Sequence, residues 1–245
     1  MLKVENLTVN YGAIRALKNI SFNAEKGEII TLIGSNGAGK TTSFYMIVGL
    51  VKPNGGNTYL DNTNITNFPI YQRAQHGIGY LAQEASVFRK MTIEDNILSV
   101  LQLTKLSKKE QQAKMESLID EFSLGHIRTN RGDLLSGGER RRTEIARALA
   151  TDPKFILLDE PFAGVDPVAV EDIQRIVAQL KQKNIGILIT DHNVQETLAI
   201  TDKTYLMFEG GILKAGNPVD LANDEMVRKV YLGQNFELRT KKLDF

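Results

Sequence analysis

Apolar and polar residues follow three patterns along this chain. They alternate over residues 2–10 and again over 16–22, which predicts two half-buried strands. Apolar residues at helical spacing predict helices, for example at residues 44–51 and 173–180. Short apolar runs predict further strands buried within a sheet, at residues 29–33, 78–81, 155–158 and 185–189. This succession of strands and helices predicts an α/β fold.

Between the second and third of these buried runs, the pattern changes to one typical of helices. Thr92 is followed by two acidic residues, as at a capped helix start, and a second helix is predicted over 108–122. We expect this stretch to form a mainly helical lobe, and the last residues to form a tail without regular structure. The predicted division is a core of residues 1–85 and 153–235, an inserted lobe of residues 86–152 and a tail of residues 236–245.

Residues 34–41 match the pattern G-x-x-x-x-G-K-[ST] without a mismatch, between a predicted strand and a predicted helix. Glycines let successive backbone N–H groups point inward at a polyphosphate, and the helix N-terminus adds to the attraction. We expect Lys40 to reach the β- and γ-phosphates and the Thr41 hydroxyl to bind Mg²⁺. A glycine-rich turn without a ligand would not require the complete match. The predicted nucleotide-binding residues are Gly34, Ser35, Asn36, Gly37, Ala38, Gly39, Lys40, Thr41 and Thr42.

Polar residues follow three of the predicted buried strands: Gln83, the pair Asp159 and Glu160, and His192. Because parallel strands end at the same edge of a sheet, where α/β proteins bind ligands, we expect these side chains to lie near one another. Asp159 is expected to bind Mg²⁺ through water, and Glu160 to polarise an attacking water. Gln83 is expected to contact Mg²⁺ or that water, and His192 to donate to a γ-phosphate.

The segment Leu135-Ser136-Gly137-Gly138-Glu139 begins another predicted helix. Ser136 and Glu139 form a capping box, which by itself explains those two residues. Gly137 and Gly138 lower helix stability and have no evident packing value, so we interpret them as allowing backbone N–H groups to approach a phosphate. The sequence therefore predicts a second phosphate-binding segment.

Composition narrows the function classes. The chain has 245 residues, a formal net charge of +1 and no cysteine, which excludes disulfides and cysteine-based metal or thiol chemistry. The near-zero charge gives no general argument for nucleic-acid binding. The first residues show no apolar signal region, and no apolar run approaches the ~18 residues needed to cross a bilayer. We expect any membrane role to depend on partner chains.

Taken in order, these motifs resemble those of the ATP-binding-cassette ATPases, and the resemblance covers nearly the whole chain. Within that family the chain resembles the ATPase subunit of the lipopolysaccharide export transporter of Gram-negative bacteria. Ala82 departs from the pattern, because relatives commonly have proline there, although the side chain of Gln83 is unaffected. The closer match lies in residues 83–89, 135–150, 155–167, 189–197 and 230–233.

This resemblance implies a P-loop NTPase (RecA-like) core with an antiparallel β edge region and an inserted helical subdomain. It implies a head-to-tail homodimer in which each ATP meets residues 34–42 of one chain and 135–139 of the other. It further implies Glu160 as catalytic base, His192 as γ-phosphate sensor and Asp166 as an inter-subunit link. Tyr11 would be the base-stacking aromatic, or else a plain tyrosine at a strand end. Asp166 is also explained as a helix N-cap before Pro167.

The resemblance also implies two transmembrane permease subunits, bound through their coupling helices at the cytoplasmic face of the inner membrane. Glu84, Phe88 and Arg89 are the expected contacts, with the alternative that Phe88 belongs to the core of the lobe. Two rival functions stay open. One is the ATPase of another transporter, such as a branched-chain amino-acid importer. The other is a soluble cassette ATPase acting on DNA or ribosomes, which the single cassette, short lobe and low charge disfavour.

Overall fold

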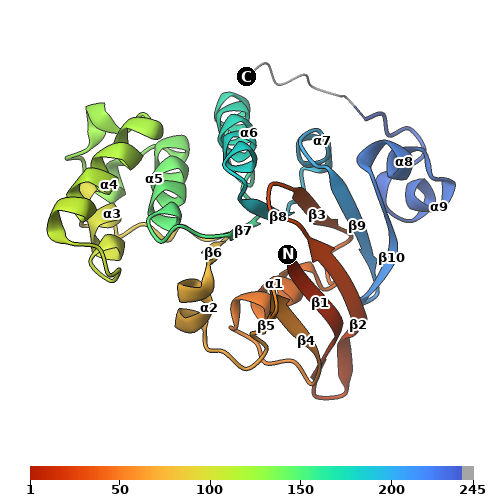
Figure 1. The fold of residues 1–245 in the computed structure, drawn as a ribbon. Helices are drawn as coiled ribbons and strands as arrows, with labels where there is room; N and C mark the ends of the chain where they lie inside the picture. Colours follow the sequence, from red (N-terminus) through yellow and green to blue (C-terminus); the bar gives the residue numbers. More distant parts are fainter. Residues whose placement is uncertain (239–245) are drawn as a thin grey trace.

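The structure is a computed structural model that describes residues 1–238 of the chain. Two sheets form the core (Figure 1). The antiparallel sheet has the order β2-β1-β4-β5, with β1 (Leu2–Tyr11), β2 (Ile14–Ala24), β4 (Gly55–Leu60) and β5 (Thr63–Asn64). The central sheet has the order β10-β9-β3-β8-β7-β6, with β3 (Ile29–Ile33), β6 (Ile78–Leu81), β7 (Phe155–Asp159), β8 (Gly186–Thr190), β9 (Lys203–Phe208) and β10 (Gly211–Gly216). Its strands are parallel except β10, which forms a hairpin with β9.

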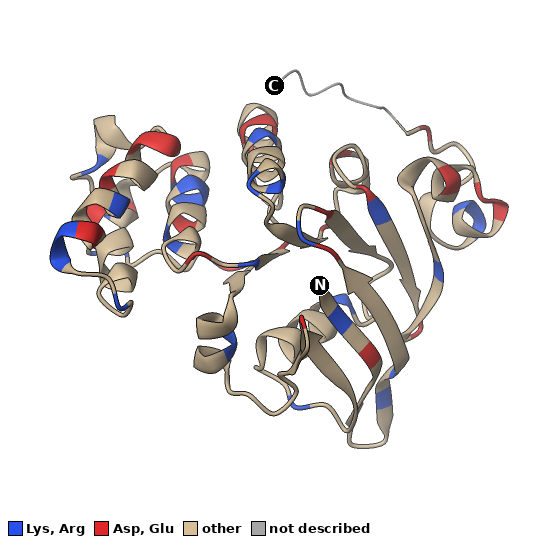
Figure 2. Ribbon diagram, viewed as in Figure 1, with Lys and Arg blue, Asp and Glu red and all other residues tan. Residues whose placement is uncertain are grey.

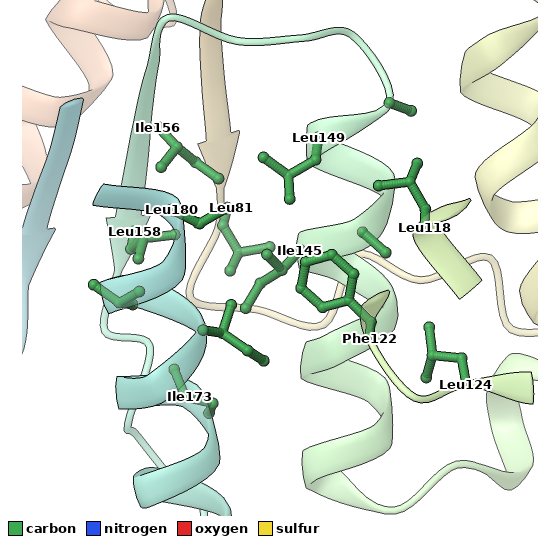
Figure 3. Close-up of a cluster of buried hydrophobic side chains, with 14 of the residues drawn as sticks. Leu81, Leu118, Phe122, Leu124, Ile145, Leu149, Ile156, Leu158, Ile173 and Leu180 are labelled. Carbon is green, nitrogen blue, oxygen red and sulfur yellow. The ribbon is translucent and has the colours of Figure 1, made fainter. Parts of the chain in front are cut away.

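Every residue of β3, β7 and β8 is buried, which explains why their sequences are continuous apolar runs. Successive residues of β7 enter opposite cores. Phe155 and Leu157 pack toward the antiparallel sheet and α1 (Lys40–Val48), whereas Ile156 and Leu158 pack toward helices. Figure 3 shows the second core, in which Leu81, Ile156 and Leu158 meet Ile145 and Leu149 of α5 (Gly137–Leu149) and Ile173 and Leu180 of α6 (Pro167–Gln182). The central sheet is therefore covered on both faces.

Between β6 and β7 the described chain forms helices, turns and one isolated bridge. Each of the three long helices here begins at a side-chain cap, as the sequence pattern indicates for Thr92 and Ser136, and Ser107 caps the third. Charged residues of both signs lie side by side on two of them (Figure 2). The helices are α3 (Ile93–Leu101), α4 (Lys108–Glu121) and α5 (Gly137–Leu149).

The remaining helices surround the core. They are α2 (Ile70–His76), α6 (Pro167–Gln182), α7 (Val194–Leu198), α8 (Pro218–Asn223), α9 (Glu225–Val227) and a short turn of π-helix at Arg228–Leu232. Within residues 1–238, no helix is both long and apolar enough to cross a bilayer. Most of the predicted C-terminal tail, residues 239–245, lies outside the described residues.

Candidate active site

The predicted phosphate loop lies between β3 and α1, and two of its glycines are required by the structure. Gly34 has φ +151° and Gly39 has φ +103°, in the region that favours glycine. A Cβ atom on Gly34 would lie 2.3 Å from the backbone oxygen of Met207, and one on Gly39 would lie 2.3 Å from the side chain of Leu17. The loop is therefore pressed against β9 and β2, and its backbone is held in shape by the fold.

Lys40 is buried and folded back over this loop. Its Nζ donates to the backbone oxygens of Gly34, at 2.7 Å, and Ser35, at 3.1 Å. Burial lowers the pKa of the Lys40 ammonium group, while the nearby carboxylates of Glu160 and Asp159 act in the opposite direction. The lysine charge therefore lies between the phosphate loop and the acidic ends of the central strands.

Asp159, the last residue of β7, is buried and held by neighbouring strands. One carboxylate oxygen accepts from Thr190 Oγ1 at 2.6 Å, and the other accepts from the Tyr80 hydroxyl at 3.4 Å. Burial, followed by the Asp159 charge, raises the pKa of Tyr80 above its ordinary value. These two contacts orient the carboxylate at the edge of the sheet, where the sequence pattern predicts it.

Glu160 brings three predicted site residues together. Its Oε2 accepts from Nε2 of Gln83 at 2.7 Å, and its Oε1 lies 2.6 Å from Nε2 of His192. Glu160 has φ +48°, an uncommon backbone conformation for a residue other than glycine. A carboxylate flanked by an amide and an imidazole is suited to holding a water molecule and accepting its proton.

The phosphate loop and His192 also border the same cavity. It has a volume of about 330 Å³ and is lined by Gly34, Ser35, Asn36, His192, Val194, Tyr231, Leu232 and Phe236. A smaller cavity of about 140 Å³ joins Gln83 and Glu160 to Gly137 at the start of α5. The two cavities place the predicted catalytic residues between the phosphate loop and the beginning of that helix.

Asp191 was missed by the sequence reasoning, although it is adjacent to His192. Its Oδ2 accepts from the backbone N–H of Phe162 at 2.8 Å, and its Oδ1 from that of Asn193 at 2.7 Å. Burial raises the pKa of the Asp191 carboxyl, and these hydrogen bonds oppose the shift. The residue thereby ties the turn after β7 to the turn after β8. A polar residue directly after a buried strand was the available signal.

A buried ion pair on α5 was also missed. Arg141 Nη1 lies 3.3 Å from Glu144 Oε2 and donates to the Ala82 carbonyl at 3.0 Å. Glu144 Oε1 accepts from the backbone N–H groups of Ser86, at 2.5 Å, and Val87, at 3.1 Å. The segment that carries Gln83 is therefore fastened to α5. The only sequence signal is the spacing of three residues between the two charges.

At the start of α5 the capping box is present. Ser136 Oγ accepts from the backbone N–H of Glu139 at 3.3 Å, and Glu139 Oε2 accepts from that of Ser136 at 2.8 Å. The expectation that neither glycine has packing value is wrong for Gly138, because a Cβ there would lie 3.1 Å from Cβ of Ala169 on α6. It holds for Gly137, where a Cβ would meet open space. Leu135 is buried, so its side chain supports the segment from inside.

Substituting the two glycines should separate these roles. Gly137→Ala is expected to preserve or raise the free energy of unfolding, by up to about 1 kcal/mol, because alanine favours helix. It should also lower ATP turnover, because a methyl group would obstruct a phosphate at the helix start. Gly138→Ala is expected to have a free energy of unfolding about 1 kcal/mol lower than that of Gly137→Ala, because its methyl group would press on Ala169 of α6. Denaturant unfolding and phosphate release measure both effects. Unchanged turnover in Gly137→Ala would contradict the interpretation.

The other predicted residues lie at the surface or at helix ends. Tyr11 is at the end of β1 with 49% of its surface exposed, which is compatible with both alternatives for it. Asp166 caps α6 by accepting from the backbone N–H of Ala169. Glu84 and Arg89 are exposed, and so is Phe88, whose ring lies 5.0 Å from the Arg147 guanidinium. The alternative that Phe88 belongs to the core of the lobe is therefore wrong.

Comparisons with known proteins identify the family and the fold. The model of the ABC transporter family matches residues 17–163. The chain is 50% identical over 239 residues to the lipopolysaccharide export system ATP-binding protein LptB of Haemophilus influenzae, with 97% of this chain and 99% of the relative covered. It resembles the ADP conformation of MJ1267, an ATP-binding cassette of an ABC transporter, with a TM-score of 0.86 and 31% identity over 96% of this chain and 99% of the other.

A dimeric structure of MJ0796, a bacterial ABC transporter cassette, is also similar, with a TM-score of 0.79 and 25% identity over 89% of this chain and 99% of that one. These matches confirm the predicted fold class, an α/β P-loop core with an antiparallel sheet and added helices. Because the family model spans more than half of the chain and the LptB match spans nearly all of it, the chain belongs to the ABC transporter family, as one of its ATP-binding ATPases.

Proposed function

We propose that this chain is the ATP-hydrolysing subunit of a transporter that extracts lipopolysaccharide from the inner membrane for export to the outer membrane. The observation that carries the hydrolytic role is Glu160, whose two carboxylate oxygens are held by Gln83 and His192 beside the phosphate loop. The cargo is inferred from the 50% identity to LptB of Haemophilus influenzae, which is named for lipopolysaccharide export.

In the proposed reaction, water attacks the γ-phosphorus of ATP in line with the oxygen that bridges to the β-phosphate. That bridging bond breaks, Glu160 accepts the proton of the water, and ADP and phosphate are the products. Lys40 would contact the β- and γ-phosphates, and His192 would donate to the γ-phosphate. Because His192 lies against Glu160 in the structure, this contact must loosen for both side chains to reach the substrate.

The residues at the strand ends also suit Mg²⁺. Thr41, Gln83 and Asp159 offer a hydroxyl, a carboxamide and a carboxylate, and Mg²⁺ prefers oxygen ligands from few protein groups together with phosphates. Thr190 and Tyr80 hold the Asp159 carboxylate at this edge of the sheet. When bound, Mg²⁺ would neutralise charge on the phosphates.

We propose that the segment 135–139 of a second copy closes each ATP site, which makes the active form a head-to-tail homodimer. The open space beside Gly137 supports this proposal, because a partner's phosphate needs room at the helix start. The dimeric structure of the related cassette MJ0796 supports it as well. In this arrangement Asp166 would lie at the contact between subunits, and Tyr11 would stack on the adenine.

A groove between the core and the helical lobe is the proposed docking site for a coupling helix of a membrane partner. Its cavity of about 500 Å³ is lined by Tyr71, Ala74, Gln75, Val100, Leu103, Thr104, Lys105 and Thr151. Tyr71 and Leu103 are 60% and 85% exposed, and apolar surface of this kind suits the apolar face of a short helix. A neighbouring cavity of about 160 Å³ extends from this groove to Ser86 and Arg147, close to Phe88. We propose Glu84, Phe88 and Arg89 as the rim of the docking groove.

The partners are proposed to be two transmembrane permease subunits resembling LptF and LptG, which would hold the chain at the cytoplasmic face of the inner membrane.

The test is to purify the chain from its native membrane, identify the integral subunits that accompany it, and reconstitute the complex with lipopolysaccharide. ATP-dependent extraction of lipopolysaccharide is expected. Subunits of an amino-acid importer would overturn the cargo. ATPase stimulation by DNA or ribosomes, without membrane partners, would overturn the transport role.

Replacing Phe88 by alanine should weaken this docking. Truncating an aromatic residue that is an energetic hot spot of an interface costs about 2 kcal/mol or more, so we expect at least about a fivefold loss of co-purified membrane subunits. Phe208→Ala is the matched control, because Phe208 is also an exposed aromatic, at 39%, but lies on β9. Equal recovery of membrane subunits with both variants would contradict the proposed surface.

A further inference from the structure

Helix α2 is attached to the core in an unusual way. Among its seven residues, Arg73 is the one with a buried side chain, at 2% exposure, whereas Ile70 and Tyr71 are 45% and 60% exposed. On its outer side, Tyr71, Ala74 and Gln75 form a wall of the groove described above. Apart from the ring contact between His76 and Phe68 and the connection to β6, the position of this wall therefore depends on what Arg73 contacts.

All four hydrogen bonds of the Arg73 side chain go to backbone carbonyls. Its Nη1 donates to Met46 and Ile47 in the last turn of α1, both at 2.6 Å. Its Nε donates to Phe68 at 2.8 Å, and its Nη2 to Thr66 at 2.7 Å. Carbonyl groups at the C-terminal end of a helix have no N–H donor within the helix, and the guanidinium of Arg73 supplies the missing donors. Arg73 thus binds α2 rigidly to the C-terminal end of α1.

The other end of α1 begins at Lys40, within the phosphate loop itself. A helix of nine residues is about 13 Å long and moves as a unit. Burial lowers the pKa of Arg73 to about 10, so the guanidinium stays charged at neutral pH. Its planar fork contacts α1 and the 66–68 segment at once, which a lysine ammonium group cannot reproduce.

We infer that α2 is a mechanical link between the phosphate loop and the docking groove, and that Arg73 is the positioning residue that couples them. A displacement of α1 on nucleotide binding carries the Met46 and Ile47 carbonyls, and Arg73 transmits it to the groove wall. ATP binding would then change the affinity of the groove for a docked helix. By linkage, the docked helix must change the affinity for ATP by the same factor. The inference rests on the proposed function.

Hydrogen–deuterium exchange on the purified Glu160→Gln chain, with and without MgATP, tests this link. We expect MgATP to change amide exchange in residues 70–76 by at least about fivefold, which is the lower range of typical allosteric coupling. Arg73→Lys in the same background should abolish that change while the phosphate loop still becomes protected. Arg228→Lys is the matched control, because Arg228 also donates to backbone carbonyls, those of Ala222 and Gln234, but does not join α2 to α1.

A fluorescence measurement provides an independent reading. The chain has no tryptophan, so Tyr71→Trp places a single reporter on the outer face of α2. Its emission should shift as MgATP binds, and Arg73→Lys should remove the shift. If ATP binds and neither exchange nor emission changes in α2, the link is wrong and the proposed function stands. If ATP does not bind, the proposed function itself fails. Should Arg73→Lys not fold, the absence of any MgATP-dependent change in α2 with Arg73 intact would still overturn the link.

Discussion

Glu160→Gln is expected to reduce ATP turnover by about 10²–10⁴-fold while ATP binding is retained, because a carboxamide cannot accept the proton of the attacking water. The substitution preserves the shape of the side chain. The amide can still contact Gln83, which donates to Oε2 at 2.7 Å, so the surrounding residues should keep their positions. Binding without turnover should also let a nucleotide-bound dimer accumulate. Phosphate release, equilibrium ATP binding and size-exclusion chromatography with MgATP measure the three effects.

Glu209→Gln is the control for this experiment. Glu209 has φ +47°, nearly the same backbone conformation as Glu160 at +48°, but it lies in the exposed turn between β9 and β10. The same chemical change in the same backbone conformation should therefore leave turnover near the wild-type value. If Glu160→Gln also hydrolyses ATP at the wild-type rate, Glu160 is not the base and the assignment of the strand-end residues is wrong.

Lys40→Ala is expected to weaken ATP binding by about 10–150-fold, because a hydrogen bond to a charged group contributes roughly 1.5–3 kcal/mol. The variant would also lose the two donations to the Gly34 and Ser35 carbonyls, which hold the loop in shape. Turnover should fall at every accessible ATP concentration, since the same ammonium group would stabilise charge on the γ-phosphate in the transition state. Titration with a fluorescent ATP analogue measures the affinity directly.

The control here is Lys52→Ala, which removes an exposed lysine shortly after the same helix. It alters the net charge by the same amount, so a general electrostatic effect on a polyanionic ligand would appear in both variants. An affinity for ATP within about twofold of wild type in Lys40→Ala would contradict the proposed phosphate site. That magnitude corresponds to less than 1 kcal/mol, which is too small for a charged contact to phosphate.

The structure changes how the two segments that lead to the membrane partner are understood. The resemblance to transporter ATPases implies that Glu84, Phe88 and Arg89, shortly after Gln83, contact the membrane partner. The structure fastens that segment to α5 through Arg141 and Glu144, so motion of α5 reaches Gln83 directly. Through Arg73 it adds a second connection, at the α2 wall of the groove. A docked helix would therefore touch α2, which Arg73 joins to α1, and at the rim the segment after Gln83, which is fastened to α5.

Much of the site was predictable from the sequence because it depends on short-range patterns. Phosphate binding requires particular residues within one loop, helix starts require a cap and its partner three residues later, and buried strands require continuous apolar runs. The polar residues at strand ends, Gln83, Asp159, Glu160 and His192, were predictable for the same reason, since parallel strands present their ends at one edge.

The contacts that arise between distant segments were decided only by the tertiary structure. Three of these contacts join elements that are distant in sequence. They are the packing of Gly138 against Ala169, the hydrogen bonds from Arg73 to carbonyls of α1, and those of the buried pair Arg141 and Glu144 to the segment after β6. In a single sequence these residues have no local pattern that distinguishes them from a helix interior or a solvated charge. Their roles depend on burial, which removes water as the alternative partner and so makes each specific contact necessary.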